Sequence, residues 1–152
     1  MSLKLRLIRI AVISTTAWLF FSYVLVPLKI QGKSMEPTYH DGGFGFCWRQ
    51  RFLFSPPDYG DVIAIRFSGR SVVLLKRVVA LAGDTVEFRR GSLYVNGRQV
   101  GEPYVKYRLD WNLPPRTVKP GRVYVIGDNR GVPMSRHHFG QVKMQRILGG
   151  VL

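Results

Sequence analysis

Cysteine is almost absent from this chain, and acidic residues are scarce. Among 152 residues there are one cysteine, Cys47, and nine Asp and Glu against 23 Lys and Arg. A single cysteine excludes an intramolecular disulfide and a zinc site built from several cysteines. The net charge of +14 favours an anionic partner, which could be nucleic acid or the headgroups of anionic lipids.

Several motifs of well-known enzymes are missing as well. There is no His-Glu-x-x-His metal motif, no phosphate-binding loop, no dinucleotide-binding glycine pattern and no Ser-x-x-Lys. The three histidines have no spacing that makes one of them the partner of a serine, and with one cysteine they form a poor ligand set for a metal. We therefore expect no metal and no cofactor. His137 and His138 are expected at the surface beside Arg136; the remaining histidine is His40.

The chain does contain one long uncharged apolar run, Ile10 to Leu28, which covers 19 residues. A helix of that length nearly crosses a hydrocarbon core of about 30 Å. A cleaved signal peptide has a shorter apolar core and a small-x-small exit, which this run lacks. We predict that residues 1–29 form an N-terminal tip and a single transmembrane helix. A buried helix of a soluble protein is the alternative.

Basic residues flank the run on both sides. The excess before it is small, so the positive-inside rule weakly favours a cytoplasmic N-terminus and an extracytoplasmic position for residues 30–152. With such an anchor, membrane lipid is a better partner than nucleic acid. Trp48 to Phe54 mixes aromatics with arginines and is expected either to contact headgroups or to form a buried strand with two solvated arginines. The flanking basic residues are Lys4, Arg6, Arg9, Lys29 and Lys33.

Beyond residue 30 the sequence consists of short apolar runs separated by turns. Val62 to Phe67 and Val72 to Val79 are β-branched runs of strand length, and Asn96-Gly97 is the strongest hairpin signal. Tyr104 to Pro120 contains Pro114-Pro115 and is expected to be irregular. The pattern predicts a mainly antiparallel, barrel-like β domain behind one helix.

Two residues stand out chemically. Ser34 follows the apolar run on constrained backbone, where its hydroxyl is held at a fixed angle; an ordinary surface turn is the alternative. Lys76 emerges from the apolar run that begins at Val72, which reads as a strand buried on both faces. Burial lowers the pKa of a lysine, and a neutral amine beside a serine hydroxyl can act as a general base. A strand-end lysine that reaches water is the other interpretation.

Three blocks of the sequence, taken together, resemble the type I signal peptidase family of membrane-anchored Ser-Lys proteases. Gly32 to Thr38 is similar to the family's Ser-Met-x-Pro-Thr box, and Lys76 to Asp84 to its Lys-Arg box. Gly127-Asp128-Asn129-Arg130 opens a third box, Gly-Asp-Asn. Gly60 to Ile63 also resembles the family's Gly-Asp-Val strand, and the order and spacing of all four agree.

The resemblance implies a serine endopeptidase in which Ser34 is the nucleophile and Lys76 the general base. It implies cleavage of signal peptides from secretory preproteins after small-x-small sites, at the outer face of the cell membrane. The oxyanion would be held by the Ser34 N–H and a second donor. Some members carry a hydroxyl two residues before the nucleophile, where this chain has Gly32.

Substrate would lie as an added strand in a groove between the stretch before Ser34 and the strand before Lys76. Shallow apolar pockets there would accept small side chains. The residues expected to line this groove are Ile30, Gln31, Val72, Val73, Leu74 and Leu75.

The third box departs from the family pattern. The family continues with a serine near the base and then an aspartate that pairs with the arginine after the base, here Arg77. In an ungapped alignment Pro133 replaces that serine and Ser135 replaces the aspartate. Asp128 is the residue expected to pair with Arg77 in its place.

Two other functions fit part of the pattern. Self-cleaving repressors share the Gly-x-Ser-Met and strand-lysine pattern, but they need a DNA-binding domain where this chain has its apolar run. A non-catalytic membrane-tethered β module that binds anionic lipid or polypeptide is the third possibility, and the changes at Pro133 and Ser135 are what favour it. The sequence does not indicate an oligomeric state.

Overall fold

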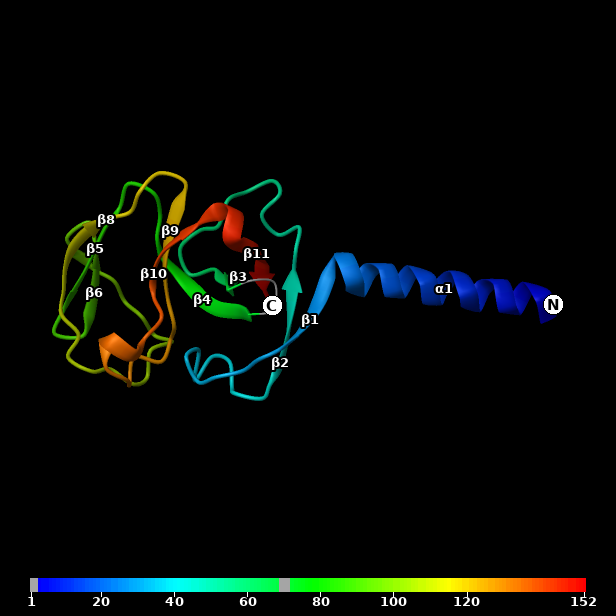
Figure 1. Cartoon of the computed structure of the whole chain (residues 1–152), viewed down its shortest axis with the longest axis horizontal. Helices are drawn as coiled ribbons and strands as arrows, with labels where there is room; N and C mark the ends of the chain where they lie inside the picture. Colours follow the sequence, from blue (N-terminus) through cyan, green and yellow to red (C-terminus); the bar gives the residue numbers. More distant parts are fainter. Residues whose placement is uncertain (1–2, 69–71) are drawn as a thin grey trace.

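In the computed structural model, which describes residues 3–68 and 72–152, one helix leads into two antiparallel β-sheets that lie side by side. Figure 1 shows α1 projecting from the end of the β domain formed by β1 and β2. The helices are α1 (Leu3–Tyr23) and the short 3-10 helices η1 (Met134–Arg136) and η2 (Met144–Arg146). The strands are β1 (Leu25–Lys29), β2 (Phe44–Trp48), β3 (Val62–Ser68), β4 (Val72–Ala80), β5 (Thr85–Arg89), β6 (Ser92–Val95), β7 (Arg98–Gln99), β8 (Leu113–Thr117), β9 (Arg122–Ile126), β10 (Gly140–Lys143) and β11 (Ile147–Val151).

The apolar run is divided between a helix and a strand. α1 ends at Tyr23, and Leu25–Lys29 form β1, which pairs with β2 over its full length. The expectation that residues 1–29 hold only the tip and the helix is therefore wrong for the last five residues. Pro27 cannot continue a helix, whereas an edge strand such as β1 tolerates it.

The helix begins at Leu3, seven residues before the apolar run, and so regains at its N-terminal end the length that it loses after Tyr23. It includes Lys4, Arg6 and Arg9, and its 21 residues span about 31 Å, close to the thickness of a hydrocarbon core. No side chain of α1 is buried in the protein. Among the described residues, α1 alone is long and apolar enough to cross a membrane, as judged by length and composition.

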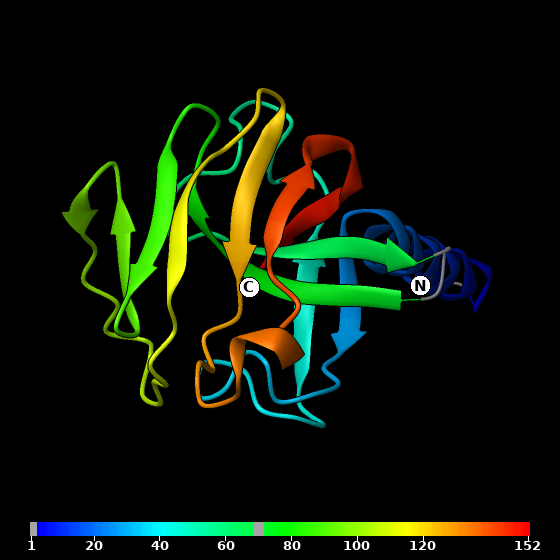
Figure 2. The same cartoon turned by 60° about the vertical axis from the view of Figure 1, so that its left-hand side comes forward.

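The strands form a seven-stranded sheet in the order β1-β2-β11-β3-β4-β9-β10 and a four-stranded sheet in the order β7-β6-β5-β8. Every strand pair is antiparallel. This confirms the predicted fold class. Figure 2 shows the β3–β4 pair extending out of the domain beneath β9 and β10.

Two apolar cores share the central strands β4 and β9. On β9, Tyr124 and Ile126 face the core between the two sheets, and Val123 and Val125 face the core inside the larger sheet. Strands buried on both faces read as continuous apolar runs, which explains the pattern at Val78–Ala80. Val73, Leu74 and Leu75 are only half-buried, so the expectation that the run before Lys76 is buried on both faces is wrong. The segments that carry Lys76 and Gly127 are consequently anchored by both cores.

The segment Tyr104 to Pro120 is more regular than expected, because Leu113–Thr117 form β8 on the edge of the smaller sheet. Only Leu113 of this strand is buried. An edge strand accommodates Pro114 and Pro115 because one side of its backbone needs no partner strand.

Candidate active site

The tertiary structure brings Ser34 and Lys76 into direct contact. Ser34 lies in the loop between β1 and β2, Lys76 lies in β4, and the Lys76 Nζ donates a hydrogen bond of 2.7 Å to the Ser34 Oγ. The Lys76 side chain is buried, with 3% of its surface exposed, which excludes the strand-end lysine that reaches water. Burial lowers its pKa from 10.5 to about 8, although the negative charge of Asp128 opposes this shift. About one tenth of such amines are neutral at pH 7.

The Gly127-Asp128-Asn129 box holds the Ser34 loop in place. The Asn129 N–H donates a hydrogen bond of 3.1 Å to the Ser34 carbonyl, and the Asn129 Nδ2 donates one of 3.0 Å to the Lys33 carbonyl. At Gly127 an added Cβ would overlap the Ser34 carbonyl oxygen. Close backbone approach therefore explains why a glycine precedes Asp128.

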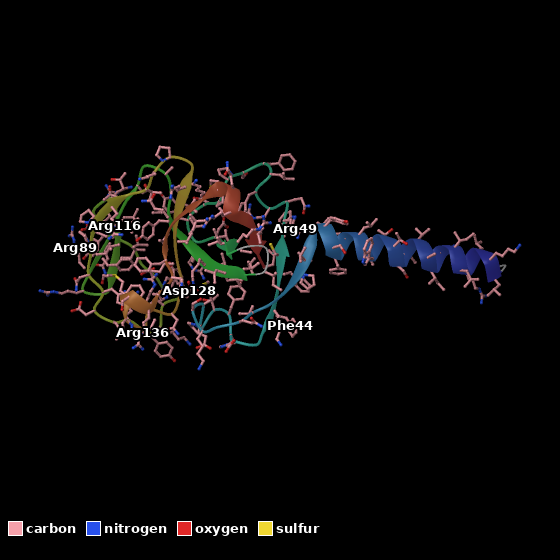
Figure 3. The ribbon with its side chains drawn as sticks, viewed as in Figure 1. Phe44, Arg49, Arg89, Arg116, Asp128 and Arg136 are labelled. Carbon is pink, nitrogen blue, oxygen red and sulfur yellow. The ribbon has the colours of Figure 1, made fainter. Side chains whose placement is uncertain are left out.

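Asp128 pairs with Arg77, as expected from the departures in the third box. Its fully buried carboxylate accepts hydrogen bonds from the Arg77 Nε (2.9 Å) and Nη2 (2.6 Å) and from the Thr38 hydroxyl. The Arg77 guanidinium also lies over the ring of Tyr104, 4.0 Å from its centroid. Figure 3 places Asp128 at the inner end of β9, between the two sheets.

The two replaced positions lie outside this network. Pro133 and Ser135 are both exposed, and Ser135 belongs to η1. The carboxylate that balances Arg77 thus comes from the residue after Gly127 and not from position 135.

Gly32 has a structural role that limits its use as an oxyanion donor. Its backbone N–H donates a hydrogen bond of 2.8 Å to the Asp41 carboxylate. Its φ of +90° lies in the left-handed region that favours glycine. Gly32 is therefore a poor candidate for the second oxyanion donor that the resemblance implies.

A groove of about 300 Å³ runs alongside Ser34 and is lined by residues 27–32, Met35 and the β4 residues Val73, Leu74 and Leu75. The structure thus brings Ile30 and Gln31 together with β4, as the sequence predicted, and Val72 is the first residue of that strand. Along Val72–Lys76, β4 pairs with β3, while its pairing with β9 begins only at Arg77. Within the described part of the chain, the β4 edge that faces the groove has no partner strand.

His137 corrects a second expectation, since it is buried and not at the surface. Its Nε2 lies 2.9 Å from the Asn129 carbonyl, to which it must donate, and its Nδ1 is buried without a hydrogen-bond partner. Burial, together with the nearby charge of Lys76, lowers its pKa to about 4, so the ring is neutral. Trp111 packs edge-on against it at 5.0 Å, a contact between distant residues that no local pattern indicates. His138 is exposed, as expected.

The described residues contain no group of three or more His, Cys, Asp and Glu side chains that could hold a metal ion. The chemistry offered by the site is that of a buried amine beside a hydroxyl at the edge of an open groove. Such a pair is suited to nucleophilic attack on a carbonyl carbon.

The family model described as "Signal peptidase, peptidase S26" matches residues 4–152. The chain belongs to this family. Signal peptidase I of Bacillus licheniformis is 33% identical over 144 residues, which cover 88% of this chain and 77% of the relative. Signal peptidase I V of Bacillus subtilis (strain 168) is 31% identical over 140 residues, covering 83% of each chain.

A comparison with solved structures supports the same family assignment. The crystal structure of a signal peptidase I from Enterococcus faecalis V583 superposes with a TM-score of 0.52 at 28% identity. The match covers 64% of this chain and 98% of that one. Membership of the signal peptidase family, together with the apolar α1, favours a membrane-anchored protease over a self-cleaving repressor.

Proposed function

We propose that this chain is an endopeptidase of the signal peptidase I type that removes signal peptides from exported preproteins. The observation that carries the proposal is the 2.7 Å contact between the Lys76 Nζ and the Ser34 Oγ, with Lys76 buried. A hydroxyl is a weak nucleophile at neutral pH unless a neighbouring base removes its proton. The lowered pKa of Lys76, about 8, makes its neutral amine such a base.

In the first half of the reaction the neutral Lys76 amine takes the Ser34 proton as the Oγ attacks the scissile carbonyl. The Ser34 N–H is the proposed oxyanion donor. As the tetrahedral intermediate collapses, the Lys76 ammonium gives its proton to the leaving amine of the mature protein, and the signal peptide stays as an ester on Ser34. Lys76 then takes a proton from water as the water oxygen attacks the ester, and it returns this proton to the Ser34 Oγ as the ester bond breaks and the signal peptide leaves with a free carboxylate.

The groove beside Ser34 supports a preference for extended peptides with small side chains. The unpaired edge of β4 at Val73–Leu75 can accept the segment before the scissile bond as an added strand. Ile30 and Met35, which line the groove, are 4% and 1% exposed, so they are fixed walls with little room to move. Such walls favour alanine-sized residues at alternate positions, as in small-x-small sites.

The apolar α1 supports a single-pass anchor in the cell membrane, with the β domain on the extracytoplasmic side. Lys4, Arg6 and Arg9 lie in the N-terminal half of α1, which fits a cytoplasmic N-terminus. Because β1 follows α1 after Val24 alone, the groove is held near the membrane surface, where an inserted signal peptide presents its cleavage site.

The test is cleavage of a purified precursor in detergent. Ser34→Ala and Lys76→Ala should each abolish cleavage, and the double variant should be no worse, because the two side chains act as one unit. Lys76→Arg should also be inactive, because a guanidinium does not lose its proton near neutral pH. Substantial turnover by any of these variants removes that residue from the mechanism. No cleavage by the parent chain would instead favour a non-catalytic membrane-tethered module.

A further inference from the structure

A second groove of about 300 Å³ lies on the face of the larger sheet, between β10 and the outer ends of β3 and β4. In Figure 2 this region is at the front of the domain, where β10 and η2 lie above the β3–β4 pair. The apolar side chains along it include Ile65, Leu74 and Val125, one from each of three adjacent strands. Because β10 is the last strand of its sheet, its outer edge has no partner strand among the described residues.

The charged side chains along this groove are all cationic. Arg66, Arg122, Lys143 and Arg146 line it, and none of the nine acidic residues does. The ion pairs of the described chain are formed by other arginines. An adjoining groove shares Arg122 and adds two more cations, Arg116 and Lys119.

This basic groove adjoins the candidate active site. Leu74 and His138 line both it and the pocket above Ser34 and Lys76. The groove lined by Ile30 also borders Ser34, and it is the place proposed for the signal peptide itself. A substrate peptide that leaves the first groove past Ser34 would enter the pocket lined by His137 and His138. The basic groove lies next to that pocket.

We propose that the basic groove is a subsite for Asp and Glu side chains in the mature part of the precursor, a few residues beyond the scissile bond. The proposal rests on the proposed function. Arginine and carboxylate form strong paired hydrogen bonds, and four cations that have no ion pair among the described residues surround an apolar floor and offer several such contacts. Segments translocated next to a membrane span are poor in Lys and Arg, so most precursors would bring no repelling charge into the groove.

The observations favour a peptide over a lipid headgroup as the occupant. The groove opens beside the dyad. The exposed aromatic side chains that continue the apolar surface of α1 belong instead to β2, which lies near the edge of the larger sheet opposite to β10. Phe46 of β2 contacts Phe21 of α1, with ring centroids 6.4 Å apart. The surface suited to lipid is therefore separate from the basic groove.

The first experiment compares three precursors that differ only at two positions within about the first ten mature residues, carrying Asp, Asn or Lys. In zwitterionic detergent at low salt, kcat/KM should be about tenfold higher for the Asp form than for the Asn form. About 0.5 M salt should reduce this ratio to about twofold. Equal values for the Asp and Asn forms at every pair of positions would overturn the proposal.

Variants of the exposed groove residues test whether the preference for Asp comes from this groove. The double variant Lys143→Gln with Arg146→Gln should bring the Asp-to-Asn ratio close to one, and Arg146→Glu should raise the relative rate of the Lys form. Arg98→Gln is the matched control, since Arg98 is an exposed arginine on β7 of the smaller sheet. If Arg98→Gln lowers the ratio as much as the groove variants do, the preference comes from overall charge and not from this groove.

A binding measurement separates this proposal from the proposed function. Full-length Ser34→Ala protein should bind a fluorescent peptide with the acidic mature sequence about tenfold more tightly than its Asn form. Binding without cleavage by the parent chain would refute the proposed function and leave the subsite intact. Cleavage with no preference for Asp in either assay would refute the subsite alone. Binding to phosphatidylglycerol vesicles that the groove variants lose, with no effect of peptide charge, would identify a lipid headgroup site instead.

Discussion

At the scale of single residues, we predict that the burial of Lys76 determines how the rate of precursor cleavage depends on pH. With a pKa of about 8, the neutral base is the minor form at pH 7, so kcat/KM should rise about tenfold per pH unit below that value and level off above it. His137 has a pKa of about 4 and stays neutral over this range, so His137→Gln should not move the limb. Initial rates from about pH 5 to pH 9.5 check this, and a flat profile would contradict a lysine base.

Asp128 should influence both stability and this pH profile. Asp128→Asn leaves the Arg77 guanidinium without its charge partner, and breaking a buried pair from one side costs about 3–5 kcal/mol. The Asp128 charge also raises the pKa of Lys76, so its removal should shift the acid limb to lower pH.

Thermal unfolding and the pH profile of the same Asp128→Asn preparation measure the two effects. Asp110→Asn is the control, since Asp110 is exposed and forms no ion pair with any residue that the structure describes. It should change the free energy of unfolding by less than about 0.5 kcal/mol. A limb that moves to higher pH in Asp128→Asn would contradict the assigned charge effect.

At the scale of elements, the end of β9 positions the loop that carries Ser34. Gly127→Ala would place a methyl group against the Ser34 carbonyl group, with the buried His137 ring 3.0 Å away, so there is little room for relief. The loop should shift away from Lys76, and kcat should fall by about 100-fold or more, because a displacement of about 1 Å has that effect on aligned groups.

Gly101→Ala is the matched control for this substitution, since a Cβ there meets nothing within 4 Å and its φ is not positive. It should leave kcat within about twofold of the parent chain. Circular dichroism confirms that both variants keep the β fold. Parent-like activity of Gly127→Ala would show that the close contact does not position the nucleophile.

At the scale of the whole molecule, α1 and β2 form one apolar surface. Phe44, Phe46 and Trp48 alternate along β2 with their side chains exposed, and Leu53 and Phe54 beyond it are 68% and 96% exposed. Figure 3 shows Phe44 and Arg49 at the end of the domain next to α1, with Arg89 and Arg116 at the opposite end. Phe52 packs on the core, but of the segment Trp48 to Phe54 only Trp48 lies in a strand, so the alternative of a buried strand is wrong.

We predict that this surface lies in the membrane interface independently of the anchor. A truncated chain that begins at Val24, which keeps β1, should sediment with vesicles containing anionic lipid, and less so as salt rises. Phe44→Ser and Phe54→Ser should each weaken binding about tenfold, whereas Tyr107→Ser, an exposed aromatic between β7 and β8, should not. A truncated chain that stays entirely in the supernatant at low salt would show that α1 alone holds the protein at the membrane.

The local sequence was enough to predict the central strands at Val62–Ser68 and Val72–Ala80 and the antiparallel class, and the motif boxes identified Ser34 and Lys76 as candidates. These predictions depend on properties that act over a few residues: β-branched runs, turn dipeptides, and motif boxes whose order survives in the chain. The exact end of the helix was not among them, because an apolar run of this composition suits a membrane helix and a buried strand equally. Pairing with Phe44–Trp48 decided where α1 gives way to β1.

Only the tertiary structure decided the environment of each charged group. Ser34 and Lys76 are 42 residues apart, and their contact depends on both cores that hold β4 and β9. The burial of His137 depends on Trp111, a contact that the sequence did not predict. Desolvation and ion pairing depend on what surrounds a side chain in three dimensions, and the residues that surround these groups come from distant parts of the chain.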